Sequence, residues 1–196
     1  WLQNEITKVA DGIPFFEANV DYRGQQPVRN AVGQPLSSFF GYQVEGLFRD
    51  QAEVDAHATQ EGAGPGRFKF SDLNNDGVIN IDDRTFIGNP VPDFTGGINL
   101  KFEYKNFGLE MYSFASLGGD IYNVSKLFTD FYPLFPGAAI SARVKDSWTP
   151  QNLDAEIPIF ENVDNFSTIS QVNSFYVEDG SFFRMQNVTL SYNLTQ

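Results

Sequence analysis

The feature that most limits the possible folds is a strict alternation of apolar and polar residues from Ile98 to Lys105. Apolar side chains hold every even position and polar side chains every odd one, so a strand here has one apolar and one polar face. The short turn sequence 106–108 follows, and Leu109–Ala115 then reads as an antiparallel return strand. The sequence therefore predicts a β-hairpin with a tight connection within residues 94–119.

A third long strand is predicted from about Phe175 to Leu194. Its second half is apolar at even positions from Val188 onward, whereas its first half is apolar at the odd positions of Phe183 and Met185. A change of phase inside one strand is explained most simply by one extra residue. We therefore predict a β-bulge near residues 186–187.

The remaining segments have weaker patterns. Residues 120–173 contain several prolines and no sustained period, which indicates a long loop with one short helix near 138–147. Towards the amino terminus, short strands are expected within 15–22 and 39–48, and a helical turn within 51–57.

Composition limits the class of protein. A net charge of -12 repels nucleic acid phosphates, so we exclude nucleic-acid binding, and the absence of cysteine removes disulfides and thiolate metal sites. Long strands with a tight turn at one end and long loops at the other are typical of an outer-membrane β-barrel. The alternative is a soluble all-β domain with one solvated face, and composition alone favours that alternative.

An acidic loop at residues 72–83 carries the clearest chemistry. It matches an EF-hand-type loop, in which oxygen ligands fall at positions 1, 3, 5, 7, 9 and 12 and glycine at position 6 allows a sharp turn. Gly77 is at the sixth position and the apolar Ile79 at the eighth. The ligands that this pattern predicts are Asp72, Asn74, Asp76, the Val78 carbonyl, Asn80 and Asp83.

Oxygen ligands at this spacing favour Ca²⁺ over Mg²⁺, which requires octahedral geometry and keeps several waters. Two carboxylates held about 4 Å apart repel each other by roughly 4 kcal/mol at an effective dielectric of 20, so a cation would help the loop to close. Asp83 is shorter than the glutamate usual at position 12. Because protein groups fill every ligand position, the Ca²⁺ would be structural. The alternative is an Asx-rich turn with its carboxylates in water.

No catalytic group is recognisable. His57, the single histidine, lies in a polar stretch without a nearby nucleophile, and the glycine-rich residues 62–66 lack the lysine and hydroxyl of a phosphate loop. We therefore predict that the protein is not an enzyme.

Several stretches together carry a resemblance to a known family. They are Gly33–Tyr42, Glu45–Phe48, Phe70–Ile79, Asp83–Pro90, Pro92–Phe94, Gly119–Asn123, Trp148–Pro150 and Val177–Leu190. In residues, order and spacing they resemble the carboxy-terminal third of SusC/RagA-type TonB-linked outer-membrane transporters. The resemblance covers most of residues 32–194, and it favours the barrel over the soluble fold.

The resemblance implies an all-β part of a barrel of about 22 strands with a plugged lumen. It implies location in the bacterial outer membrane in contact with lipid, a SusD-like surface lipoprotein as partner, a glycan or peptide as substrate, and energy from TonB through an amino-terminal part. The chain should then be a fragment that lacks the plug and the final strands.

Within that fragment we expect residues 1–93 to be extracellular with the calcium loop at 72–83, residues 94–119 to form a barrel hairpin, 120–173 a long extracellular loop and 174–196 a barrel strand. The alternative is a secreted, calcium-stabilised carbohydrate-binding or adhesion module.

Overall fold

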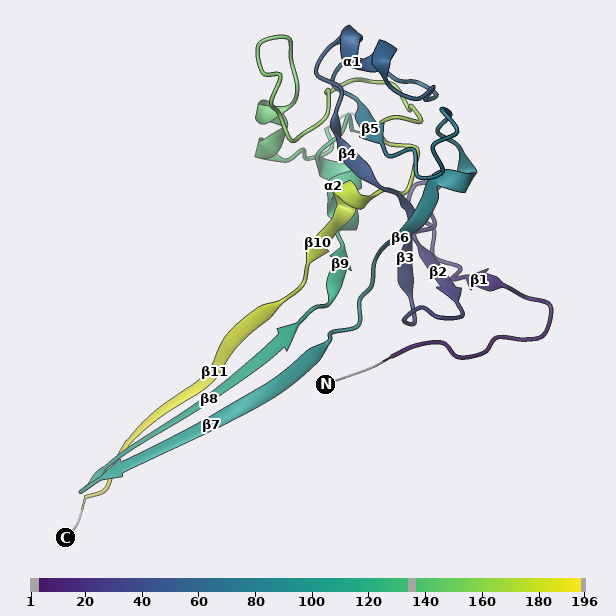
Figure 1. Cartoon of the computed structure of the whole chain (residues 1–196). Helices are drawn as coiled ribbons and strands as arrows, with labels where there is room; N and C mark the ends of the chain where they lie inside the picture. Colours follow the sequence, from purple (N-terminus) through teal and green to yellow (C-terminus); the bar gives the residue numbers. More distant parts are fainter. Residues whose placement is uncertain (1–3, 134–136, 195–196) are drawn as a thin grey trace.

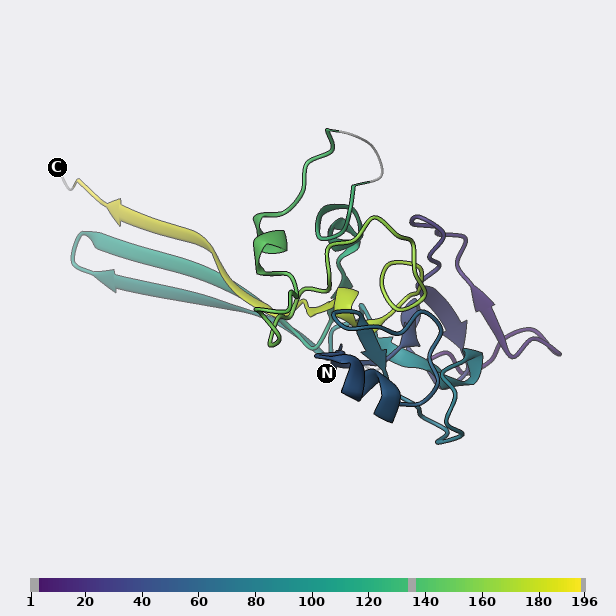
Figure 2. The ribbon, with the colours of Figure 1, turned by 90° about the horizontal axis from the view of Figure 1, so that it is seen from above.

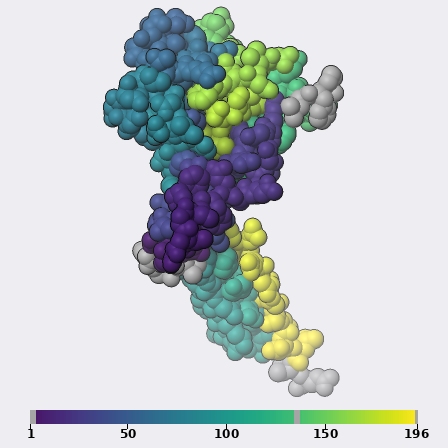
Figure 3. Space-filling model, turned by 90° about the vertical axis from the view of Figure 1, so that its right-hand side faces the viewer, coloured from purple at the N-terminus to yellow at the C-terminus, as the bar shows by residue number. Residues whose placement is uncertain are grey.

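Three long strands extend from a head of short strands, short helices and loops (Figure 1). The computed structural model describes residues 4–133 and 137–194. The predicted segments 1–93, 120–173 and 174–196 each include a few residues outside the described ones, namely 1–3, 134–136 and 195–196. Figure 2 shows from above that the long strands project to one side of the head, and Figure 3 shows them as a narrow stem below it.

The long sheet confirms the predicted hairpin. Strands β7 (Phe94–Tyr104) and β8 (Phe107–Leu117) pair antiparallel along their whole length, from Phe94 opposite Leu117 to Tyr104 opposite Phe107. Their connection is only two residues long, and Lys105 adopts a positive φ of 53° there. Strand β11 (Phe182–Tyr192) pairs with the other edge of β8. The order in the sheet is β11-β8-β7.

The predicted bulge is present in β11. Met185 lies opposite Ser113 and Asn187 opposite Tyr112, so Gln186 is the extra residue between two neighbouring pairs. This residue changes the phase of the alternation. As a result, the apolar side chains before and after it lie on the same face of the sheet.

The strand predicted from Phe175 to Leu194 is divided in two. It begins with a 3₁₀ helix (η3, Ser174–Tyr176) and a short strand β10 (Val177–Asp179) that pairs with β9 (Asp120–Tyr122) in the head. The break follows at Gly180, whose N–H donates to the carbonyl of Gly119 at 2.7 Å. A Cβ at Gly180 would lie 2.6 Å from that carbonyl oxygen, so only glycine fits there.

Besides the β9-β10 pair, the head contains a four-stranded sheet and a second two-stranded sheet. The four-stranded sheet has the order β1-β2-β3-β6, and the second two-stranded sheet pairs β4 with β5. Gln43 separates β3 from β4, so the strand expected within 39–48 is two strands. The bounds are β1 Phe15–Glu17, β2 Val28–Ala31, β3 Ser38–Tyr42, β4 Val44–Leu47, β5 Phe68–Phe70 and β6 Arg84–Gly88.

Short helices complete the head. Helix α1 (Gln51–Ala56) occupies the predicted helical turn and begins at Asp50, whose carboxylate accepts the N–H of Glu53 at 2.9 Å. The 3₁₀ helix η2 (Ala142–Asp146) lies within the predicted range 138–147. The structure differs from the predicted loop 120–173 in that this segment also contains strand β9 and helix α2 (Val124–Thr129). A further 3₁₀ helix, η1 (Ile81–Asp83), ends the acidic loop.

An aromatic core holds the head together. Phe68, Phe70 and Tyr176 are at most 1% exposed, and the rings of Tyr42 and Phe70 stack at 5.0 Å. The late loop closes over them, since the N–H of Phe68 donates to the carbonyl of Ser167 at 2.8 Å. Burial raises the pKa of the Tyr176 phenol well above its usual value, because the ionised form loses its hydration.

Candidate functional site

One face of the long sheet is largely apolar. Across the three strands, Leu100 lies opposite Met111 and Met111 opposite Val188. The other rows on this face are apolar as well, except that Ser113 lies between Ile98 and Met185. Most of these side chains are exposed; Phe102 is 56% and Leu190 73% exposed. The face consists of Ile98, Leu100, Phe102, Tyr104, Phe107, Leu109, Met111, Phe183, Met185, Val188, Leu190 and Tyr192.

The opposite face of the same sheet is mostly polar, apart from Tyr112 and the neighbouring rings of Phe114 and Phe182. Lys101 forms an ion pair with Glu103 at 2.8 Å, and Asn99 donates to the Glu110 carboxylate at 3.3 Å. Asn187, Thr189 and Ser191 continue this face on β11. A monomeric soluble protein rarely exposes so large an apolar surface, so the sheet is suited to hydrocarbon on one face and water on the other.

The acidic loop folds around its own backbone N–H groups. Asp72 accepts the N–H of Asp76 at 3.3 Å and that of Gly77 at 2.9 Å. Asn74 accepts the N–H of Asp76 at 2.9 Å, and Asp76 accepts that of Val78 at 2.8 Å. Gly77 has a φ of 84°, which strongly favours glycine at this turn. The side-chain oxygens of Asp72, Asn74 and Asp76 therefore bind the backbone of one tight turn.

Asp83 closes the loop from its other end. Its carboxylate accepts the N–H of Leu73 at 2.9 Å and that of Asn80 at 2.8 Å, and the residue is fully buried. Ile79 lies in the core, and its N–H donates to Thr59 O at 2.9 Å. The loop connects the end of β5 to β6. The Asp83 bonds hold its two ends together, and the Ile79 bond to Thr59 attaches it to the rest of the head.

The atoms predicted to bind the metal suit Ca²⁺, because all of them are carboxylate, amide or carbonyl oxygens. They are also engaged within the loop: the Val78 carbonyl accepts from the Asn80 side chain at 3.2 Å, and the Asn74 amide donates to Asp76 at 2.9 Å. Within residues 4–133 and 137–194, no three Asp, Glu, His or Cys side chains converge as a metal site would require. The six predicted ligands share one loop, and the Ca²⁺ itself stays a prediction.

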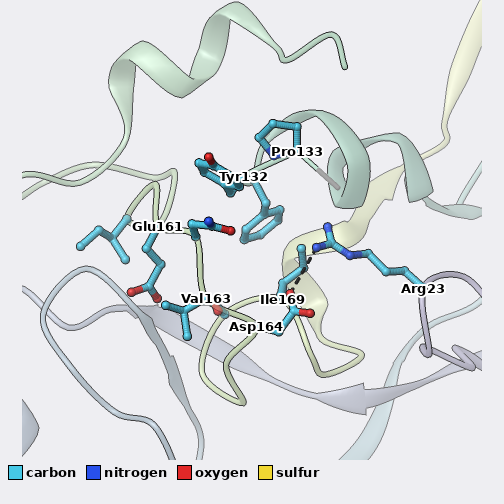
Figure 4. A pocket seen from close by; sticks show the side chains of 11 residues that line it. Arg23, Tyr132, Pro133, Glu161, Val163, Asp164 and Ile169 are labelled. Carbon is cyan, nitrogen blue, oxygen red and sulfur yellow. Dashed lines mark hydrogen bonds and ion pairs between the residues drawn. The ribbon is translucent and has the colours of Figure 1, made fainter. Parts of the chain in front are cut away.

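A pocket of about 320 Å³ opens on the head, between residues far apart in the sequence (Figure 4). Its floor includes the buried Phe131 and Ile169, and its rim carries Arg23, Glu161 and Asp164. The Arg23 guanidinium donates to Asp164 at 3.2 Å. The pocket therefore combines an apolar floor with a charged rim, as many binding sites do.

Arg67, which does not line the pocket, holds the lining residue Glu161 in place. Arg67 donates to both carboxylate oxygens of Glu161, at 2.9 and 2.7 Å, and also to the carbonyl of Gly62 at 2.8 Å. This forked pair ties the late loop to the turn before β5. The rim charges are thus paired within the chain, which leaves the pocket without a free charge that would single out one class of ligand.

Sequence reasoning missed this pocket. Its residues come from near position 23, from 131–133 and from 159–169, and no local pattern connects these segments. His57, which the sequence indicated as an ordinary residue, contacts the Phe70 carbonyl through Nε2 at 3.0 Å and packs edge-on against Phe48. In the described part of the chain, no helix is long and apolar enough to cross a bilayer.

Curated relatives match almost the whole chain. It is 33% identical over 201 residues to TonB-dependent receptor P3 and 32% identical over 204 residues to TonB-dependent receptor P26, both of Formosa agariphila. It is 26% identical over 199 residues to TonB-dependent receptor SusC of Bacteroides thetaiotaomicron. These matches cover 98–99% of the chain, which spans about a fifth of the length of those relatives, 18–19%. No protein-family model matches the sequence.

Solved structures with the same fold include two described as the RagAB peptide transporter and as the RagAB peptide importer in a closed-closed state. Their TM-scores are 0.67 and 0.64, at 20% and 19% sequence identity. Each match covers 96% of this chain and 19% of the solved chain. The long sheet and the head therefore occur together in a larger protein of known structure.

Proposed function

Since the chain belongs to the SusC/RagA type of TonB-dependent receptors, we propose that it forms part of the wall and the extracellular surface of an outer-membrane nutrient transporter. In this proposal β7, β8 and β11 cross the bilayer as three neighbouring barrel strands. The head, with residues 4–93 and most of 120–173, lies outside the cell. The role is one of transport, not of catalysis.

The apolar face of the long sheet carries this proposal. Each of its strands has eleven residues. A tilted strand needs about 9–11 residues to cross a bilayer, so the length fits. The two-residue turn fits a periplasmic connection, and the large head fits the extracellular side, where barrel loops are long.

Partners and substrate follow from the same proposal. A SusD-like lipoprotein would cover the extracellular mouth and contact the head, and TonB would act through another part of the receptor. The substrate would be a glycan or a peptide. The structural similarity to RagAB, a peptide transporter, supports the second of these two classes.

Epitope insertion tests the topology. An epitope placed between Lys105 and Asn106 of the receptor should be hidden from antibody on intact cells and become accessible after the outer membrane is permeabilised. The same epitope in the exposed loop at 150–154 should be labelled on intact cells, because the head is extracellular. Surface labelling of both sites, or recovery of the receptor in a soluble fraction, would contradict the proposal.

We also propose that the acidic loop binds one structural Ca²⁺ through Asp72, Asn74, Asp76, the Val78 carbonyl, Asn80 and Asp83. The support is the spacing of these oxygen-bearing residues in one loop, whose two ends Asp83 holds through the N–H groups of Leu73 and Asn80. The ion would supply positive charge among carboxylates that otherwise repel one another. Since Asp83 is buried and holds both ends of the loop, it would link metal binding to the stability of the head.

Calorimetry of the receptor tests the metal. Ca²⁺ at a concentration 100 times its Kd should stabilise the folded state by about 2.7 kcal/mol and raise Tm, and a chelator should reverse the effect. Asp76→Ala should abolish the rise. Asp82→Ala is the matched control, since Asp82 is an exposed acid of the same loop outside the ligand positions. An identical Tm with Ca²⁺ and with chelator in the unaltered receptor would refute the site.

A further inference from the structure

Arginine and phenylalanine side chains alternate across the sheet β1-β2-β3-β6. The Arg29 guanidinium lies between two rings, 3.9 Å from the centroid of Phe15 and 3.7 Å from that of Phe40. The guanidinium of Arg84 lies 5.0 Å from the centroid of Phe40. We call Phe15, Arg29, Phe40 and Arg84 the arginine–phenylalanine stack.

The two cations of the stack have different partners. Arg29 donates to the Glu17 carboxylate at 2.6 Å, and both side chains are largely covered, at 15% and 34% exposed. Among the described residues, the one hydrogen bond of the Arg84 side chain is a long one of 3.4 Å to the carbonyl of Phe40. Among the ion pairs of residues 4–133 and 137–194, none involves Arg84.

Further donors in the stack are unused. The Nε atoms of Arg29 and Arg84 are both buried, and neither has a hydrogen-bond partner among the described residues. Burial, and next the charge of Arg29, lowers the pKa of Arg84, since both disfavour the charged guanidinium. The Glu17 carboxylate is thus bonded to Arg29 alone, and Arg84 has no bonded carboxylate among the described residues, in a chain whose net charge is -12. A partly buried cation normally has a counter-charge, because its loss of hydration is otherwise uncompensated.

Other surface at this sheet is suited to contact. Phe15 of β1 is 40% exposed, and Val32, the residue after β2, is 52% exposed. Phe16 of β1 lines an apolar groove of about 410 Å³ together with Ile13 and Leu36. Interfaces between proteins are enriched in aromatic residues and arginine at their centre. The apolar surface and the incompletely paired Arg84 therefore suit such an interface.

We propose that Arg84, supported by Arg29, binds the carboxylate of an aspartate or glutamate from another part of the same receptor polypeptide. This inference rests on the proposed function, in which the chain is one part of a longer receptor; the relatives it matches are about five times longer. The planar fork of the guanidinium suits a carboxylate, which can accept two parallel hydrogen bonds. The contact would fix the sheet β1-β2-β3-β6 against the rest of the receptor.

The sign of a change in Tm tests the contact. In the complete receptor, Arg84→Met should lower Tm by about 2 °C or more, because the docked carboxylate would lose its partner. If no carboxylate is docked, the same substitution removes an unpaired, partly covered charge and leaves Tm unchanged or higher, which would overturn the proposal. Lys145→Met is the control: Lys145 is exposed, and no ion pair of the described residues involves it, so Tm should not change.

Cross-linking identifies the carboxylate. In a receptor with Arg84→Lys, a water-soluble carbodiimide should join the new amine to the docked carboxyl group as an amide, with the lost oxygen carried away as the urea. Peptide mass spectrometry should place this amide on an acidic residue of the receptor outside residues 1–196. A product only with Glu17 or Asp83, a product with another protein, or none at all would overturn the proposal. Neither readout requires transport or membrane insertion, so the epitope experiment can fail independently.

Discussion

Leu100→Arg should destabilise the long sheet by about 2–4 kcal/mol if β7 crosses the outer membrane as proposed, because a charge near the middle of a lipid-facing strand must then leave water. Leu100 lies near the middle of β7, opposite Met111, and its side chain is 43% exposed on the apolar face. The free energy of unfolding is measured by urea titration of the receptor in lipid vesicles. The folded fraction at each urea concentration is read from the mobility of the folded barrel on unheated gels.

Asn99→Arg is the matched control for this substitution. Asn99 is the preceding residue and lies on the polar face, opposite Tyr112. An arginine there faces water and polar side chains, so the free energy of unfolding should change by less than about 1 kcal/mol. If both arginines cost the same, the two faces of the sheet do not meet different solvents, and the membrane assignment fails with them.

Phe70→Ala should cost about 3–5 kcal/mol of head stability, the usual range for a fully buried phenylalanine. Phe70 is fully buried and stacks on Tyr42 at 5.0 Å, and its ring also meets that of Phe166 at 5.9 Å. The variant loses the favourable free energy of burying the ring, and it also has a cavity among the neighbouring rings. Limited proteolysis of the receptor on intact cells, at increasing urea, measures the stability of the head.

Ile81→Ala is the control for the head. Ile81 lies eleven positions from Phe70 and is 69% exposed, so its truncation should change stability by less than about 0.5 kcal/mol. Equal proteolysis of the two variants would mean that the aromatic cluster is not what holds the head together.

The long strands could be predicted from the sequence because their information is local. Each alternation of apolar and polar residues specifies a strand and its faces, and the phase change predicted the bulge near residues 186–187, where Gln186 is the extra residue. The break at Gly180 could not be predicted in this way. It depends on Gly119, sixty-one positions earlier, whose carbonyl accepts the Gly180 N–H.

The same contrast applies to the candidate sites. The path of the acidic loop is specified within twelve residues, since Asp72, Asn74 and Asp76 bond to N–H groups at most five positions away. The pocket and the arginine–phenylalanine stack are built from segments whose separation in the sequence hides them. Arg23 and Asp164 are 141 positions apart, and Arg29 and Arg84 lie on different strands of a sheet with little alternation.

The closing of the head by its last loop has a consequence for the order of events after synthesis. The Tyr42 N–H bonds to Val172 O, and the Gln25 side chain to Ile169 O, so early strands stay incomplete until residues near 170 have emerged. Contacts between residues so far apart in the sequence are formed late, because the entropy of closing a long loop must be overcome first. The head should therefore gain its full protection from proteolysis only in chains that include residues near 170.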